Sequence, residues 1–366
     1  MNGVSVDWTS LTGLALIALA VASVVLMLAW WRGGLRHKSR TQRVAALAGL
    51  TLFLCFDLVV FGAYTRLSDS GLGCPDWPGC YATASPVAAA RPIAQAQALA
   101  PEGPVTERKA WIEMIHRYLA MALGTLIILM VVAAALARDA RAATLAGVTL
   151  AWVIAQGVFG ALTVTWKLYP AIVTGHLLGG MGLLALLSLQ APSAAPGPRG
   201  ALDRWALALA ALALLLQIAL GGWVSTNYAV LACTGFPQCN GQWWPAMDWS
   251  QAFTFARELG RRADGAPIAM TALVAIQWAH RLFAVVLSAA MGWLVARLSR
   301  RGPTGRRRAV IIGALVVIQL ATGLSNVVLG WPLLAALGHT AGAAALVICI
   351  GLELAALLNS RIRTSS

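Results

Sequence analysis

Nine apolar stretches run through this sequence, and each is long enough, at roughly 20 residues, to cross the core of a bilayer as a helix. Only 11% of the residues are charged, compared with about 25% in a typical soluble protein. Because backbone groups in lipid must be hydrogen-bonded within the protein, we predict an all-α polytopic membrane protein. The predicted spans are 11–31, 44–64, 111–136, 144–165, 171–190, 205–225, 271–296, 309–330 and 333–358.

The formal net charge of +14 is concentrated in short segments between spans. Such basic segments are typical of loops that stay on the cytoplasmic side of a membrane. We therefore interpret them as topology signals rather than as a site for nucleic acid. The two long loops, about 65–110 and 226–270, are then predicted to lie on the periplasmic side of a bacterial inner membrane. The basic segments are 32–43, 138–141, 199–204, 297–308 and 361–363.

Three other segments predict the nature of the N-terminal span, of one loop and of the linker between the two halves. The first span has no basic segment before it and one directly after it, which predicts an uncleaved anchor with its N-terminus outside. Segment 82–104 is rich in Ala and Pro and is predicted to be irregular. The segment "APSAAPGPRGALDR" at 191–204 is predicted to be a linker on the cytoplasmic side.

The sequence is also internally repeated. "GAYTRLSDSGLGCPDWPGC" (62–80) and "GGWVSTNYAVLACTGFPQC" (221–239) both begin with glycine and carry two cysteines at the same offsets. "EMIHR" (113–117) resembles "QWAHR" (277–281), and "TGHLLG" (174–179) resembles "LGHTAG" (337–342). Four spans per half is an even number, so both halves enter the membrane in the same sense.

We therefore predict two parallel-repeat four-helix bundles, eight core helices in all, plus one extra N-terminal transmembrane helix. The predicted domains are an anchor with a basic inside loop (1–43), an N-terminal half (44–190), a linker (191–204), a C-terminal half (205–360) and a cytoplasmic tail (361–366).

Four of the five histidines lie inside predicted spans; His37, the fifth, belongs to a basic loop. They are His116, His176, His280 and His339, two in each half. At 1.5 Å per residue, all four lie one to two turns below the outer end of their spans. A single histidine there is as well explained by a hydrogen bond between helices. Four at one depth point instead to metal ligation, and two imidazoles from facing helices can hold a haem iron from both sides. Zinc or copper would need further ligands nearby.

The two halves differ beside these histidines. Glu113 precedes His116 by three residues on the same helical face, whereas Gln277 precedes His280. A carboxylate can move protons and an amide cannot, so the first half is predicted to be the reaction site and the second a cofactor site. The alternative is that Glu113 lies at the aqueous boundary. Arg117 and Arg281 follow the two histidines and are candidates either for haem propionate contacts or for snorkelling to the membrane surface.

The six cysteines fall into two groups. Cys55 and Cys349 lie in apolar spans and are predicted to be inert packing residues. Two pairs lie in the long outer loops, where disulfides persist in an oxidising compartment. We favour two local disulfides, Cys74 with Cys80 and Cys233 with Cys239, over free thiols. Zinc would require the two pairs to meet, and a redox or haem-handling role stays open because such small rings are weak staples.

At these residues the chain resembles the haem A synthase family, in the bacterial form that has two cysteine pairs. The resemblance covers about 45–360 and rests on "YTRLSDSGLGCPDWPGC", on Glu113-x-x-His116-Arg117, on His280-Arg281 and on the duplicated His176 and His339. The first segment is specific, and the other motifs are weaker alone. The first span is a departure, because it adds a ninth helix to the eight that the family implies.

The resemblance implies that the methyl group of haem O is oxidised to the formyl group of haem A, for the biogenesis of a terminal oxidase. It implies a substrate haem near His116 and His176, with Glu113 important for catalysis, and a bis-His haem b cofactor at His280 and His339. Haem O synthase, oxidase assembly proteins and membrane lipid are the expected partners. The electron acceptor and a homo-oligomeric state stay open. The alternatives are a non-enzymatic di-haem b-type cytochrome and a haem carrier or assembly factor.

Overall fold

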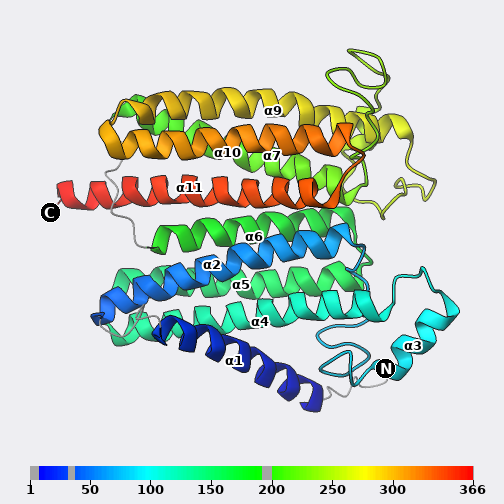
Figure 1. Ribbon diagram of the computed structural model, residues 1–366, viewed down its shortest axis with the longest axis horizontal. Helices are drawn as coiled ribbons and strands as arrows, with labels where there is room; N and C mark the ends of the chain where they lie inside the picture. The colour runs from blue at the N-terminus through cyan, green and yellow to red at the C-terminus, as the bar shows by residue number, and fades with distance from the viewer. Residues whose placement is uncertain (1–7, 32–37, 192–199, 366) are drawn as a thin grey trace. The chain divides into compact units, whose positions relative to one another are not determined.

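The computed structural model describes residues 8–31, 38–191 and 200–365, with side chains placed for 10–31, 38–191 and 200–358 (Figure 1). His37, Arg32, Arg36 and Arg199 lie outside the described residues, as do residues 192–199 of the predicted linker. The side chains of Arg361 and Arg363 lie outside them too. The chain divides into two compact units, 1–168 and 169–366.

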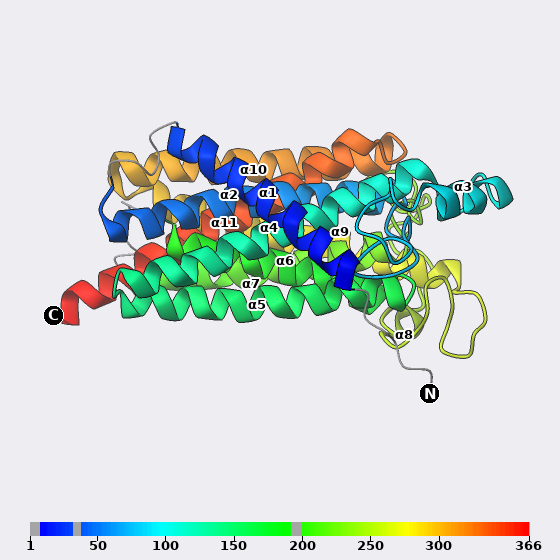
Figure 2. The ribbon, with the colours of Figure 1, turned by 90° about the horizontal axis from the view of Figure 1, so that it is seen from below.

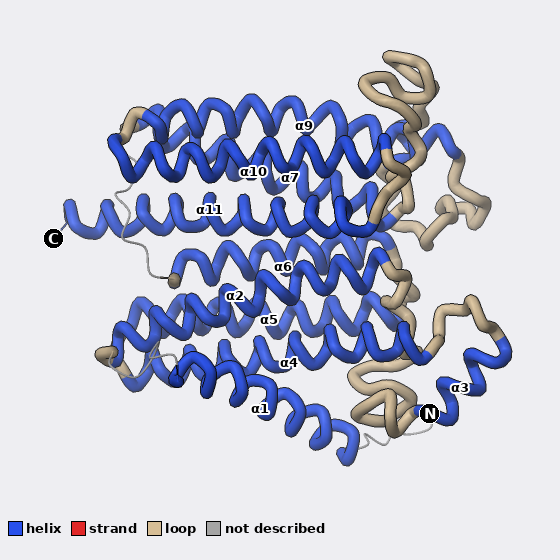
Figure 3. Tube along the Cα trace, viewed as in Figure 1, coloured by secondary structure: helices blue, strands red, loops and turns tan. Residues whose placement is uncertain are grey.

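The described residues form eleven helices and no strand (Figure 3). Nine of these helices are long and apolar enough to cross a membrane, which confirms the predicted all-α polytopic class. The first unit contains α1 (Trp8–Trp31), α2 (Arg40–Leu67), α3 (Ala90–Leu99), α4 (Glu107–Leu136) and α5 (Ala140–Thr165). The second contains α6 (Pro170–Gln190), α7 (Ala201–Thr226), α8 (Trp249–Ala252), α9 (Met270–Ser299), α10 (Gly302–Val328) and α11 (Leu333–Ser365).

In the first unit, α4 is the helix against which the others pack. It contacts α2 and α5 along its length, and α1 crosses it obliquely (Figure 2). Its buried residues recur at intervals of four, as in Ala122, Leu126, Met130 and Ala134, so one stripe faces its neighbours. The Thr106 hydroxyl accepts a hydrogen bond from the Lys109 amide and caps the start of the helix.

In the second unit, α9 packs against α7 and α10, and α11 packs against α6, α7 and α10. The basic segment between α9 and α10 is partly ion-paired. Arg297 and Arg301 bind the Asp203 carboxylate at 2.7 and 2.9 Å, and Arg308 binds Glu353 at 2.9 Å. These arginines therefore join helix ends, and their interpretation as topology signals stays a prediction.

The structure differs from the sequence-based expectation in segment 82–104. The composition of that segment predicts an irregular loop, but residues 90–99 form α3. Alanine has the highest helix propensity, and Ile93, only 2% exposed, gives the short helix one buried anchor. The arrangement of the nine spans as two four-helix halves and an anchor stays a prediction, as do the domain boundaries.

Candidate functional site

Both predicted disulfides are present. The Cys74 and Cys80 sulfurs are 2.11 Å apart in the first unit, and those of Cys233 and Cys239 are 1.95 Å apart in the second. In the first loop the Asp76 carboxylate accepts the backbone N–H groups of Tyr81 and Ala82, both at 2.6 Å. This carboxylate closes the turn that follows the second cysteine.

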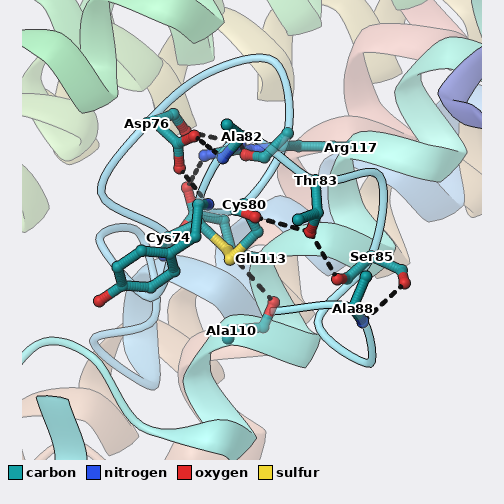
Figure 4. Close-up of a disulfide and its surroundings, with 12 residues drawn as sticks. Cys74, Asp76, Cys80, Ala82, Thr83, Ser85, Ala88, Ala110, Glu113 and Arg117 are labelled. Atoms are coloured by element: carbon teal, nitrogen blue, oxygen red, sulfur yellow. Dashed lines mark hydrogen bonds and ion pairs between the residues drawn. A yellow bond between two sulfur atoms is a disulfide. The ribbon is translucent and has the colours of Figure 1, made fainter. Parts of the chain in front are cut away.

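Helix α4 holds the first disulfide loop through two charged side chains (Figure 4). The Glu113 carboxylate accepts the Cys74 backbone N–H at 2.7 Å and forms an ion pair with Arg117. The Arg117 guanidinium also donates to the backbone carbonyls of Asp76, Pro78 and Gly79. Glu113 is 4% exposed, so the structure places it in a buried network rather than at an aqueous boundary. Its catalytic role stays a prediction.

The second unit repeats this arrangement without the acid. The Arg281 guanidinium donates to the carbonyls of Cys233, Gly235 and Gln238 at 2.9, 3.0 and 3.2 Å. Gln277 stands in the place of Glu113, and its buried Oε1 has no hydrogen-bond partner among the described residues. In both units, therefore, the arginine that follows the histidine holds the disulfide loop by hydrogen bonds to backbone carbonyls. Haem propionate contacts and snorkelling to the membrane surface both remain predictions for Arg117 and Arg281.

Replacing Arg281 with Leu should loosen the second disulfide loop. The substitution removes three hydrogen bonds from a charged donor, and we expect the free energy of loop opening to fall by about 2 kcal/mol. Chymotrypsin cleavage in detergent after the exposed Trp243 should then be about 30-fold faster. Arg306→Leu, which removes an exposed arginine of the same unit, should leave the rate unchanged. Equal rates in both variants would show that Arg281 does not hold the loop.

Helix α1 does more than anchor the chain. Leu14, 2% exposed, packs in one cluster with Cys74, Cys80 and Met114. A Cβ placed on Gly13 would lie 2.7 Å from the Ala84 Cβ, so α1 and the first loop approach closely. The N-terminal span therefore supports the disulfide loop that Glu113 and Arg117 hold from the other side.

His280 and His339 face each other in the second unit, from α9 and α11. Their ring centroids are 6.4 Å apart and the ring planes are inclined by 78°. With a ring nitrogen about 2.0 Å from a metal, two axial imidazoles have centroids about 6.0–6.5 Å apart. The spacing of this pair therefore fits axial ligation of one iron. Among the described residues no group of three or more His, Cys, Asp or Glu side chains gathers as a metal site.

The surroundings of His339 leave its Nε2 available as a ligand. The Thr322 Oγ1 atom lies 3.1 Å from His339 Nδ1 and donates its own hydrogen to the Ile318 carbonyl at 2.7 Å. A hydroxyl has one hydrogen, so towards His339 it acts as acceptor and Nδ1 carries the proton. Such a hydrogen bond fixes the tautomer of a ligating histidine. On His280, the Gln217 amide nitrogen lies 3.1 Å from Nδ1 and 3.4 Å from Nε2, and it donates to the His280 carbonyl at 3.2 Å.

Glycines on neighbouring helices make room for three of the imidazoles. A Cβ on Gly221 would lie 3.0 Å from His280 Cε1, and one on Gly323 would lie 3.1 Å from His339 Cε1. In the first unit a Cβ on Gly62 would lie 3.0 Å from His116 Nε2. Alanine at any of these positions would require the ring to shift by a few tenths of an ångström, so the glycines leave space for the imidazoles.

His116 and His176 belong to different units, His116 on α4 and His176 on α6. The His116 ring lies nearly parallel to that of Phe61, at an interplanar angle of 11°. His176 Nδ1 is buried and has no hydrogen-bond partner among the described residues. A buried imidazole nitrogen without a partner is costly, and this orphaned atom is consistent with a ligand that binds there.

Sequence reasoning missed the groups that support the histidines. Gln217 had a signal, because an amide inside the apolar run of α7 is itself a candidate functional residue. Gly62 and Gly221 begin the two repeated segments, but nothing in the sequence indicates their contact with the histidines. Thr322 had no signal, because threonine is common in membrane helices. Gly338 and Gly342, which flank His339 in sequence, pack against Thr322 and Gln319.

Comparisons with known proteins show what the chain is similar to. The family model described as cytochrome oxidase assembly protein, COX15-CtaA, matches residues 45–350. A protein of Shewanella oneidensis named Heme A synthase is 37% identical over 310 residues, 83% of this chain and 93% of that protein. Proteins of the same name from Allorhizobium ampelinum and Caulobacter vibrioides are 28% and 27% identical over 85% of this chain. The match covers 89% and 95% of those two proteins.

Proposed function

Because the chain belongs to the COX15-CtaA family of cytochrome oxidase assembly proteins, we propose that it is a haem A synthase. It oxidises the methyl group of haem O to the formyl group of haem A, which a terminal oxidase then receives. The observation that carries the proposal is the difference between two similar sites. In the first unit, His116 is close in sequence to Glu113, a buried carboxylate that accepts a hydrogen bond from the Cys74 amide. In the second unit, His280 and His339 face each other, and Gln277 stands in the place of the acid.

His280 and His339 would hold a haem b cofactor. The fit rests on the 6.4 Å separation of their rings and on the tautomer that Thr322 imposes on His339. Bound there, haem b would supply a one-electron redox centre. The residues of this chain orient the ligands: Gln217 and Thr322 by hydrogen bonds, and Gly221 and Gly323 by leaving space.

In the first unit His116 would bind the substrate, haem O, and Glu113 would act on it; for His176 a role at the substrate stays a prediction from the sequence. Oxidation of a methyl group to a formyl group releases protons as well as electrons, so a carboxylate near the reacting carbon has a function. The hydrogen bond from the Cys74 amide and the ion pair with Arg117 fix the orientation of the Glu113 carboxylate. The unpartnered His176 Nδ1 supports a ligand on the α6 side.

The same proposal covers location and partners. Two disulfides are typical of an oxidising compartment, which favours a bacterial inner membrane with the cysteine loops on the periplasmic side. Haem O must be supplied by a haem O synthase, and haem A must pass to proteins that assemble the terminal oxidase. The two alternatives, a di-haem cytochrome and a haem carrier, give no reason for a buried acid three residues before the histidine in one unit and an amide, Gln277, in the other.

Complementation tests the proposal in a cell. A host strain that makes haem O but lacks its own haem A synthase should regain haem A-dependent oxidase activity when it expresses this chain. The Cys349→Ala variant should complement equally, because in the sequence Cys349 is separated from the four intramembrane histidines and from both disulfide loops. A folded, membrane-inserted chain that restores no oxidase activity would count against haem A synthesis.

A further inference from the structure

The loop that carries the second disulfide has an unusual surface. Residues 228–247 contain no Asp, Glu, Lys, Arg or His. Three large aromatic side chains in this loop point away from the protein: Phe236 is 62% exposed, Trp243 65% and Trp244 67%. A loop in water normally carries charges, and exposed aromatic groups of this size are rarely gathered on a surface that has no partner.

This loop lies beside α9 rather than beyond its end. Its cysteines pack in one cluster with Val274 and Trp278, and Arg281, eleven residues into the helix, donates to the Gly235 and Gln238 carbonyls. Figure 1 shows the loop, in olive green, projecting sideways from α9 across the direction of the helices.

The end of helix α7 shows where the loop lies along the direction of the helix axes. Gly221 lies against His280, and α7 ends five residues later at Thr226, about 7.5 Å further along at 1.5 Å per residue. The loop leaves α7 at this point and returns to the flank of α9. It therefore lies level with the end of a transmembrane helix, where headgroups meet acyl chains.

The corresponding loop of the first unit contains a charged side chain where the second loop has none. There Asp76 closes the turn with its carboxylate. The second loop has Gly235 at the matching position of the repeat, and a neutral side chain, Asn240, accepts the Thr234 N–H at 2.9 Å and donates to the Ala232 carbonyl at 3.1 Å. A charge is costly to hold in a low-dielectric boundary, whereas a satisfied amide is not.

We propose that residues 228–247 form an interfacial anchor, which lies in the boundary between headgroups and acyl chains of the leaflet at the loop end of the helices. Tryptophan and other aromatic side chains concentrate at this depth because one part of each ring system is apolar and another is polar. The anchor is continuous with the lipid-facing side of α9, where Leu282, Val285 and Val286 are 43%, 69% and 52% exposed. Through Arg281 it also steadies the helix that carries His280.

Photo-crosslinking in the native membrane tests the occupant of this surface. Benzoylphenylalanine replaces Trp243 or Trp244 in the full chain, and the adducts are identified by mass spectrometry. Val285 on α9 is the lipid-facing reference, and Ala263, exposed between Arg262 and Asp264, is the matched loop control. We expect phospholipid adducts at 243 and 244 in yields near that at 285 and about tenfold above that at 263, as for side chains at an aromatic belt.

Two results would overturn the anchor. One is adducts at 243 and 244 with another protein or with a second copy of this chain, which would make the loop a protein interface. The other is yields at 243 and 244 no higher than at 263 while 285 is labelled by lipid, which would place the loop in water.

Discussion

Replacing His339 with Leu should remove the low-spin b-type haem spectrum that we expect of the purified protein. Leucine offers no ligand, so only His280 of the facing pair would be left to hold the proposed haem b. We expect complete loss of the low-spin signal, and the same loss for His280→Leu. Optical and electron paramagnetic resonance spectra of the detergent-solubilised protein measure it.

Thr322→Val should have a smaller effect, with haem b affinity reduced by about tenfold, because it removes only the hydrogen bond that orients His339.

His116→Leu is the matched control, since it removes an intramembrane histidine from the other unit. The low-spin signal should remain in that variant, while the content of haem O and haem A falls. If His280→Leu and His339→Leu both kept an unchanged spectrum in folded protein, the cofactor would have to lie elsewhere.

Replacing Glu113 with Gln stops the formation of haem A while haem b stays bound. The amide oxygen can still accept the Cys74 N–H, so the loop keeps this contact, but the group can no longer take up a proton at its former carboxylate. General acid–base groups contribute about 10²–10⁴-fold, so we expect product to fall by at least about 100-fold. Haem analysis of equal amounts of protein measures the loss.

Glu113→Ala separates the chemical role from the structural one. It removes the contacts with both Cys74 and Arg117, and we expect it to lose the product and also to lower the thermal stability. Glu113→Gln should lower product equally with a much smaller change in stability. Activity that followed stability across the two variants would show that Glu113 acts only by holding the disulfide loop.

Sequence patterns were sufficient for the spans and the disulfides because those features are local. A helix that crosses a membrane needs a continuous apolar run, and a disulfide between residues six apart needs little beyond two cysteines. The four histidines were visible because polar groups are rare in such runs. The helix α3 was missed because its ten residues lie in a segment whose prolines suggested a loop.

The partners of Arg117 and Arg281 could not be predicted in the same way. Arg117 binds carbonyl oxygens of residues 38, 39 and 41 positions earlier in the chain. Every residue has a carbonyl, so a carbonyl partner leaves no trace in the sequence. The position of each arginine, directly after a histidine near the end of a span, therefore suggested only the usual partners of such an arginine. These are haem propionates near a haem site and the membrane surface near a span end.

The most direct test of the account is the haem content of membranes that contain this chain together with a farnesyltransferase that makes haem O, in a host without haem A. Extracted haems are separated by liquid chromatography and identified by mass. We predict a peak at the mass of haem A, or of its hydroxymethyl intermediate, which disappears in the Glu113→Gln variant. Haem O and haem B alone, in membranes whose chain is folded and loaded with haem, would contradict the account and favour a cytochrome.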